Sequence, residues 1–151
     1  TIAEQQLDIV PVEGQELDEE QQTALDDAIA QITDEDIYNY ILEMNPDVKG
    51  IFATNGDTTM QALTACEGKD MKDVVIMGYD ADQEEIDAMK DGRIAGMIVQ
   101  NPYGMGYATV VAEARCALNM GNEANVNTGY TWVTPDNIED RTVQDILYAE
   151  K

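Results

Sequence analysis

Short apolar runs alternate with helical segments along most of this chain, and that alternation constrains its fold more than any other feature. Strand-like runs lie at 50–54, 74–79 and 94–99, separated by segments whose apolar residues recur with helical spacing. The run at 74–79 is apolar almost throughout, which is typical of a strand buried on both faces of a parallel sheet. The pattern therefore predicts an α/β fold, a three-layer sandwich with a mostly parallel central sheet.

Caps and helical spacing predict the remaining elements. These are a strand at 7–12, helices beginning after Asp18 and after Thr33 or Asp34, helices over 58–66, 83–90 and about 103–120, a strand at 130–133 and a short helix at 142–148. Asp57 is the expected N-cap of the 58–66 helix, and Asp91-Gly92 is expected to end the 83–90 helix. In a sheet covered on both faces, six strand residues should be buried: Ile51, Phe52, Val75, Ile76, Ile98 and Val99.

Composition excludes several functions. The chain has 31 acidic and 8 basic residues and a net charge of −23, so it repels nucleic-acid phosphates, and we expect no nucleic-acid binding. It contains no histidine, the commonest general base and metal ligand, and we predict neither a metal site nor a cofactor. Cys66 and Cys116 both fall in helical patterns, where we interpret them as small core residues rather than as a bridge.

Motifs of common enzyme classes are missing. The sequence contains no GxSxG elbow, P-loop or GxGxxG fingerprint, and Gly104-x-Gly106-x-x-Thr109 lacks the third small residue of the last of these. Neither cysteine has a histidine partner for a Cys–His nucleophile. The many carboxylates leave a glycosidase-type pair open, but nothing in the sequence marks one. We therefore predict no enzymatic activity and assign no catalytic residue.

Polar side chains follow the three central strand-like runs. Asn55 comes after the first run, Asp80 after the second and Gln100 after the third. In an open parallel sheet, ligands bind beyond the carboxyl ends of the strands, so these side chains would converge on one site. Their amide and carboxylate groups can satisfy several sugar hydroxyls at once. The alternative is that they only form turns and helix caps, as Asn and Asp commonly do after strands.

These segments resemble the C-terminal half of the type 1 periplasmic binding proteins, the ribose/galactose-type sugar-binding proteins of ABC importers. The resemblance runs from about 46 to 137 and rests on the order and spacing of four pieces, at 45–55, 74–80, 89–102 and 133–137. It implies a Rossmann-like, ligand-binding lobe made of residues 1–102 and 126–151. Residues 103–125 would then form a helix that packs on an N-terminal lobe missing from this sequence.

Carried over position by position, the sugar-contacting residues of that family fall on Asn55, Asp80 and Gln100. Two departures stand out. Where the family usually has Asp after the first of these residues, this chain has Gly56. The segment 18–46 is also about ten residues longer than is usual, which shifts any contact expected upstream of it.

The resemblance implies a solute-binding protein that holds a monosaccharide or related small polar molecule between two lobes and delivers it to an ABC transporter permease. Its expected location is extracytoplasmic, in the periplasm or lipid-anchored at the outer cell surface. A second interpretation is the effector-binding domain of a LacI-type transcriptional regulator, and a third is an interaction module that keeps the fold but not the pocket. Because 103–125 would lack its partner lobe, we expect the isolated lobe to self-associate.

Overall fold

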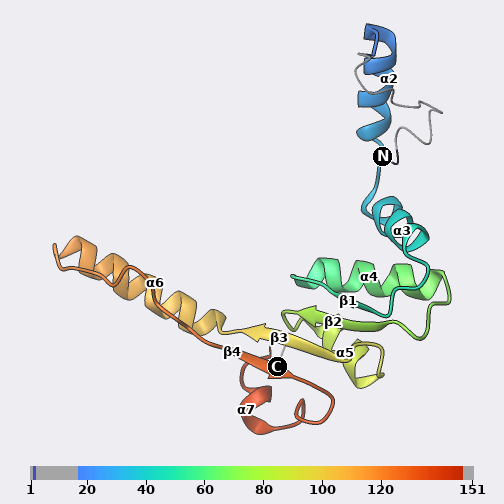
Figure 1. Ribbon diagram of the computed structural model, residues 1–151. Coiled ribbons are helices and arrows are strands. Elements are labelled where there is room, and N and C mark those ends of the chain that lie inside the picture. Colours follow the sequence, from blue (N-terminus) through green and yellow to red (C-terminus); the bar gives the residue numbers. More distant parts are fainter. Residues whose placement is uncertain (1, 3–16, 148–151) are drawn as a thin grey trace.

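The computed structural model describes residue 2 and residues 17–147 (Figure 1). Along the chain the elements are α2 (Glu19–Ile29), α3 (Asp34–Met44), β1 (Gly50–Phe52), α4 (Gly56–Gly68), β2 (Val75–Tyr79), α5 (Gln83–Lys90), β3 (Gly96–Gln100), α6 (Pro102–Ala117), β4 (Tyr130–Val133) and α7 (Arg141–Gln144). They follow the predicted elements in kind and order. The strand predicted at 7–12 and the end of the helix predicted at 142–148 lie outside the described residues.

The four strands form one sheet in the order β1-β2-β3-β4. β1, β2 and β3 are parallel, with Ile51 opposite Ile76 in the first pair and Gly78 opposite Met97 in the second. β4 pairs antiparallel with β3 and forms one edge of the sheet. This arrangement confirms the predicted α/β fold with a mostly parallel central sheet, and it brings the carboxyl ends of three strands to the same edge.

Local capping chemistry sets where the helices begin. Asp18 and Thr33 each cap their helix through a capping box, as expected at these positions. The predicted cap of α4 is wrong, because Asn55 rather than Asp57 precedes the helix, and Asn55 Oδ1 accepts a hydrogen bond of 2.9 Å from the Thr58 amide. Asn55 has the extended backbone that an N-cap requires, whereas Asp57 already lies in the first turn.

The hydrophobic core lies on one face of the sheet, beneath α4 and α5. Met89 of α5 and Met97 and Val99 of β3 are fully buried there, and Gly78 of β2 lies against Thr59 of α4. The strand order runs steadily from β1 to β3, so both right-handed crossovers place their helices on the same face. The two helices therefore pack against each other as well as on the sheet.

The opposite face of the sheet is open. The burial predicted for the six strand residues is correct for Ile76 and Val99 and wrong for Phe52 and Val75, which are 51% and 50% exposed. The other two strand residues are partly buried. Phe52 and Val75 lie on the face away from α4 and α5, where the described part of the chain supplies no covering helix. The prediction was wrong because it assumed helices on both faces of the sheet. Two crossovers of the same hand that run in the same direction place both of their helices on one face.

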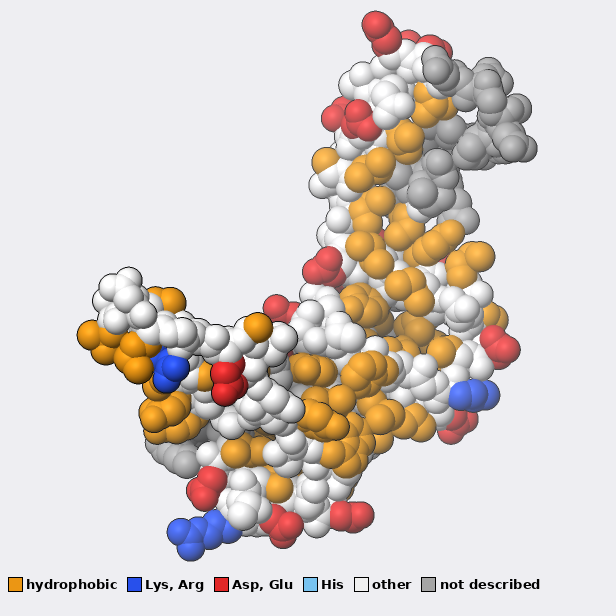
Figure 2. Space-filling view, turned by 60° about the vertical axis from the view of Figure 1, so that its left-hand side comes forward, with side chains coloured by type: hydrophobic (Ala, Val, Ile, Leu, Met, Phe, Trp, Pro, Cys, Tyr) orange, Lys and Arg blue, Asp and Glu red, His pale blue; other side chains and the backbone are white. Residues whose placement is uncertain are grey.

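Helix α3 packs on α4, and two helical arms, α2 and α6, extend from this body (Figure 1). No residue of α6 is buried, and Tyr107, Val110 and Leu118 are exposed along it. Hydrophobic side chains gather on both arms (Figure 2). Cys66 is buried as predicted, but Cys116 is exposed because α6 projects away from the core. Within residues 17–147 no helix is both long and apolar enough to cross a membrane.

Gly78 provides a test of the contact between β2 and α4. A Cβ at this position would lie 2.5 Å from Thr59 Cγ2, and Thr59 is fully buried, so Gly78→Ala should lower the free energy of unfolding by about 2 kcal/mol through overpacking. Gly68→Ala is the control, because a Cβ there meets nothing within 4 Å and alanine favours a helix. Urea unfolding of both variants gives the comparison, and a Gly78→Ala variant as stable as the wild type would contradict this packing.

Candidate functional site

The carboxyl ends of β2 and β3 bring two predicted site residues into contact. Gln100 ends β3, and its Nε2 donates a hydrogen bond of 2.9 Å to Oδ1 of Asp80, which directly follows β2. The other oxygen of Asp80, Oδ2, accepts a hydrogen bond of 3.3 Å from the amide of Gly56, the first residue of α4. One carboxylate therefore joins the ends of two strands to the start of the helix that follows β1.

Asn55 lies at the same edge, between β1 and α4, with an exposed side chain. Its Oδ1 caps α4, so this oxygen is already engaged. Its Nδ2 donates to no other residue among those that the structure describes. The structure thus brings all three predicted residues to one edge of the sheet, with Asp80 and Gln100 in direct contact and Asn55 directly before Gly56. Whether they bind a ligand stays a prediction.

Asp80 has a backbone conformation that few residues other than glycine adopt, with φ at +77°. Its amide donates to the carbonyl of Ile98 at 3.0 Å, which holds the residue against β3. Asp tolerates the left-handed region better than most residues, and local strain of this kind is concentrated at binding sites. The conformation allows the carboxylate to reach Gln100 and Gly56 together.

Glu85 of α5 lies next to this cluster and is only 1% exposed. Its Oε2 accepts a hydrogen bond of 3.0 Å from the Asp82 amide in the capping box that starts α5, while its Oε1 has no partner among the described residues. The pKa of Glu85 is raised to about 7, mainly by burial. The hydrogen bond from the Asp82 amide lowers this pKa, and the negative charges of Asp82 and Asp80 raise it further. The carboxyl is therefore largely protonated below neutral pH.

Glu85 also limits the space beside Gly56. A Cβ at Gly56 would lie 3.3 Å from Glu85 Oε2 and 3.7 Å from Asp82 Oδ2. A larger side chain at this position, such as the Asp usual in the family that the sequence resembles, would compete with Glu85 for the same space. The Glu85 carboxyl thus lies between the start of α4 and the turn before α5.

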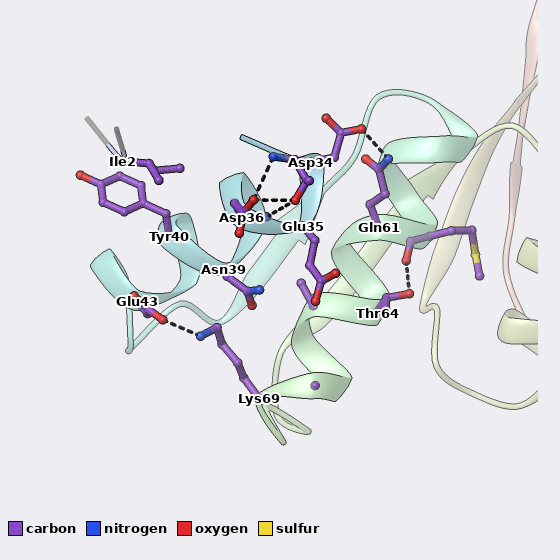
Figure 3. Close-up of a pocket in the computed structure, with 14 residues that line it drawn as sticks. Ile2, Asp34, Glu35, Asp36, Asn39, Tyr40, Glu43, Gln61, Thr64 and Lys69 are labelled. Atoms are coloured by element: carbon purple, nitrogen blue, oxygen red, sulfur yellow. Dashed lines mark hydrogen bonds and ion pairs between the residues drawn. The ribbon is translucent and has the colours of Figure 1, made fainter. Parts of the chain in front are cut away.

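Another hollow lies between α3 and α4, away from the strand ends (Figure 3). Polar side chains pair across it: Gln61 Nε2 donates to Asp34 Oδ2 and Lys69 Nζ donates to Glu43 Oε1, both at 2.9 Å. These pairs join the two helices to each other. The hollow is therefore the seam of a helix–helix contact, and the cluster at the strand ends is the better candidate for a ligand site.

The strand-end cluster offers hydrogen-bond chemistry. It presents the Asp80 carboxylate with the side-chain amides of Asn55 and Gln100. Across residues 17–147, no group of three or more His, Cys, Asp or Glu side chains is arranged to hold a metal ion. A carboxylate flanked by amides suits a ligand with several hydroxyl groups, because each hydroxyl both donates and accepts.

Sequence reasoning missed Glu85, although a signal was present. Glu85 lies three and four residues before Ala88 and Met89, which places it on the buried face of its helix. A carboxyl group on an apolar helix face must be paired or protonated. The bond from Gly56 to Asp80 had no comparable signal, because a backbone amide makes it and any residue type except proline supplies one.

The raised pKa of Glu85 makes stability depend on pH. The pKa of Glu85 in the folded protein, about 7, exceeds its ordinary value of 4.5, so the folded state binds the proton more tightly than the unfolded state does. The resulting contribution to the free energy of unfolding is present at about pH 5 and is lost as the pH rises through 7. The wild type should therefore lose about 2 kcal/mol of its free energy of unfolding between about pH 5 and pH 8, with allowance for solvent screening. Glu85→Gln should not show this loss, because its side chain does not titrate. Glu84→Gln is the control, since Glu84 is exposed on the same helix. Urea unfolding at both pH values measures this, and a pH-independent difference would contradict it.

Known proteins match the central part of this chain. A family model described as a periplasmic binding protein domain matches residues 34–117, more than half of the chain. The ribose import binding protein of Salmonella typhimurium is 35% identical over 66 residues, which cover 44% of this chain and 22% of that protein. The chain therefore aligns with about a fifth of the length of this curated relative.

Solved structures share the fold over a longer stretch. A carbohydrate transporter solute binding protein from Agrobacterium radiobacter, in complex with D-arabinose, has a TM-score of 0.68 and 26% identity and covers 85% of this chain and 50% of that one. A Brachyspira murdochii protein, described as an ABC transporter, LacI family transcriptional regulator, has a TM-score of 0.65 and 26% identity over 77% of this chain and 40% of that one. This chain spans about half the length of such structures. It belongs to the periplasmic binding protein domain family, and its resemblance to the type 1 sugar-binding members is confirmed.

Proposed function

We propose that this chain is one lobe of the solute-binding component of an ABC transporter and that it binds a monosaccharide or related small polar molecule. The observation that carries the proposal is the Asp80–Gln100 hydrogen bond at the carboxyl ends of two parallel strands, with the Gly56 amide on the same carboxylate. The matching relative is a ribose import binding protein, and one matching structure was determined with D-arabinose, which supports a sugar as the ligand class.

Each proposed site residue has a role that its atoms define. Asp80 accepts hydrogen bonds from ligand hydroxyls through the lone pairs that its two protein donors leave free. Gln100 is oriented by its bond to Asp80 and offers its Oε1 as an acceptor. Asn55 offers Nδ2 as a donor while its Oδ1 continues to cap α4. Bonds to the charged Asp80 are the strongest of this set.

A second lobe completes the site in this proposal. The chain covers 50% of the D-arabinose-bound structure, which leaves the other half of such a protein for the second lobe. We infer that residues 1–102 and 126–151 form the ligand-binding lobe and that residues 103–125, which include most of α6, pack on the other lobe. The exposed apolar side chains of Tyr107, Val110 and Leu118 support this, because a freely solvated helix rarely carries so large an apolar stripe.

The protein acts by binding rather than by catalysis, and its ligand passes to an ABC transporter permease. It works outside the cytoplasm, in the periplasm or lipid-anchored at the outer cell surface. Membership of the periplasmic binding protein domain family supports a binding function and a location outside the cytoplasm. A LacI-type effector-binding domain is the second candidate, favoured by the similarity to the Brachyspira murdochii protein. A helix-turn-helix ahead of this region in the full-length protein would favour that candidate.

Ligand binding by the full-length protein tests the role of Asp80. Calorimetric titration with D-ribose, D-arabinose, D-galactose and D-glucose should identify a sugar with a dissociation constant on the order of micromolar. Asp80→Asn should weaken its binding about 30-fold, or about 2 kcal/mol, because it removes the charge while asparagine suits the left-handed backbone. Asp73→Asn is the matched control, since Asp73 is exposed and lies at the other end of β2.

Two results would contradict the proposal. Failure of every sugar in the panel to bind at millimolar concentration would argue against a monosaccharide ligand. Unchanged affinity in Asp80→Asn, with a bound sugar in the wild type, would remove Asp80 from the site and with it the strand-end location.

The isolated chain should self-associate through α6. Nothing in the described part of the chain covers the apolar stripe that we assign to the second lobe, so two copies are expected to bury it against each other. Sedimentation velocity should show dimers at tens of micromolar chain, and Val110→Lys combined with Leu118→Lys should restore the monomer. Glu113→Gln, which leaves the stripe intact, is the control. A monomeric wild-type chain would show that α6 is not an adhesive surface.

A further inference from the structure

Glu85 contacts both segments that carry the proposed ligand site. On one side its carboxyl lies against Gly56, where a Cβ would be 3.3 Å from Oε2. On the other side the same oxygen accepts the 3.0 Å bond from the Asp82 amide, two residues after Asp80. Gly56 in turn donates to Asp80 at 3.3 Å. A change in the Glu85 side chain can therefore shift the Asp80 carboxylate in two ways, through the Gly56 amide that binds it and through the turn at 80–82.

The surroundings of Glu85 are acidic and contain one neutral hydroxyl, that of Thr59 on α4. The titratable groups around it are Asp80 and Asp82 from the turn before α5, Asp57 from α4 and Glu84 from α5. The hollow between the starts of α4 and α5, which Glu85 lines, has no Lys or Arg among its described lining residues. No described cation is thus placed to compensate a charge on Glu85.

We infer that Glu85 is a positioning residue of the ligand site: its uncharged carboxyl holds the Gly56–Asp80 contact, and a negative charge on it weakens ligand binding. The inference rests on the proposed function, since it concerns the same site. With Glu85 charged, two carboxylates repel each other across Gly56, and a ligand that excludes water from Asp80 removes the screening of that repulsion. The charged form is therefore less favourable with ligand than without it. The pKa of Glu85, raised to about 7, places this effect in the neutral range.

Nuclear magnetic resonance of the full-length protein tests the positioning role without any ligand. The Gly56 amide should show a chemical-shift inflection near pH 7 in the wild type and in the Glu84→Gln control. Glu85→Gln should abolish the inflection, because the neutral amide does not titrate. If Glu85 had a purely structural role, Glu85→Gln would change the chemical shift of the Gly56 amide but not the pH dependence of that shift. An amide without an inflection in the wild type, or one that persists in Glu85→Gln, would overturn the inference.

Calorimetric titration of the full-length protein with D-ribose at about pH 5.5 and about pH 8.5 tests the effect on binding. The dissociation constant should be about fivefold larger at the higher pH in the wild type and in Glu84→Gln, and equal at both pH values in Glu85→Gln. Equal affinity of the wild type at both pH values would overturn the inference and leave the proposed function in place. If D-ribose does not bind at either pH, the same titration is made with D-arabinose, D-galactose and D-glucose. Failure of all four would count against the proposed function, and the amide titration would still decide the role of Glu85.

Discussion

The parallel pairing of β1, β2 and β3 is the constraint on which the rest of this structure depends. It brings three carboxyl ends to one edge of the sheet, and the helices that follow β1 and β2 begin there with backbone amides that have no partner within the helix. Asp80 bonds to both features of this edge: one of its oxygens accepts a hydrogen bond from Gln100 on the neighbouring strand, and the other accepts one from the Gly56 amide at the start of α4. A single carboxylate consequently fixes the relative positions of three chain segments.

The same topology decides which surfaces the chain leaves uncovered. Both crossovers run in one direction across the sheet, so α4 and α5 share one face and the other face exposes Phe52 and Val75. α6 leaves the sheet after Gln100 and buries none of its side chains in the described structure (Figure 1). Hydrophobic side chains gather on both arms, so the described chain exposes more contiguous apolar surface than a soluble monomer usually does (Figure 2).

Much of the fold could be predicted because it depends on local signals. α5 occupies Gln83–Lys90 as predicted, since Asp82 caps it and Asp91-Gly92 ends it. The exposure of Phe52 could not be predicted in the same way, because it depends on the direction of the whole strand order and not on neighbouring residues. The true cap of α4 was missed because Asn55 and Asp57 are both good capping residues two positions apart.

The candidate site was partly predictable for a related reason. Asn55, Asp80 and Gln100 could be chosen because each follows a strand, and the parallel sheet then brings strand ends together. Asn55 has a role that was not predicted, because its Oδ1 caps α4. The Gly56 amide and the buried Glu85 are tertiary features, formed only once α4 and α5 pack side by side. The Gly56 amide supplies one of the two hydrogen bonds that Asp80 accepts from the protein.

A crystal structure of the full-length protein with its monosaccharide is the most direct test of the central claim. We predict sugar hydroxyl groups within hydrogen-bond distance of Asp80 and Gln100, between this lobe and a second one, with the Gly56–Asp80 bond kept. A sugar bound in the hollow between α3 and α4, or held by the second lobe without contact to Asp80, would contradict it.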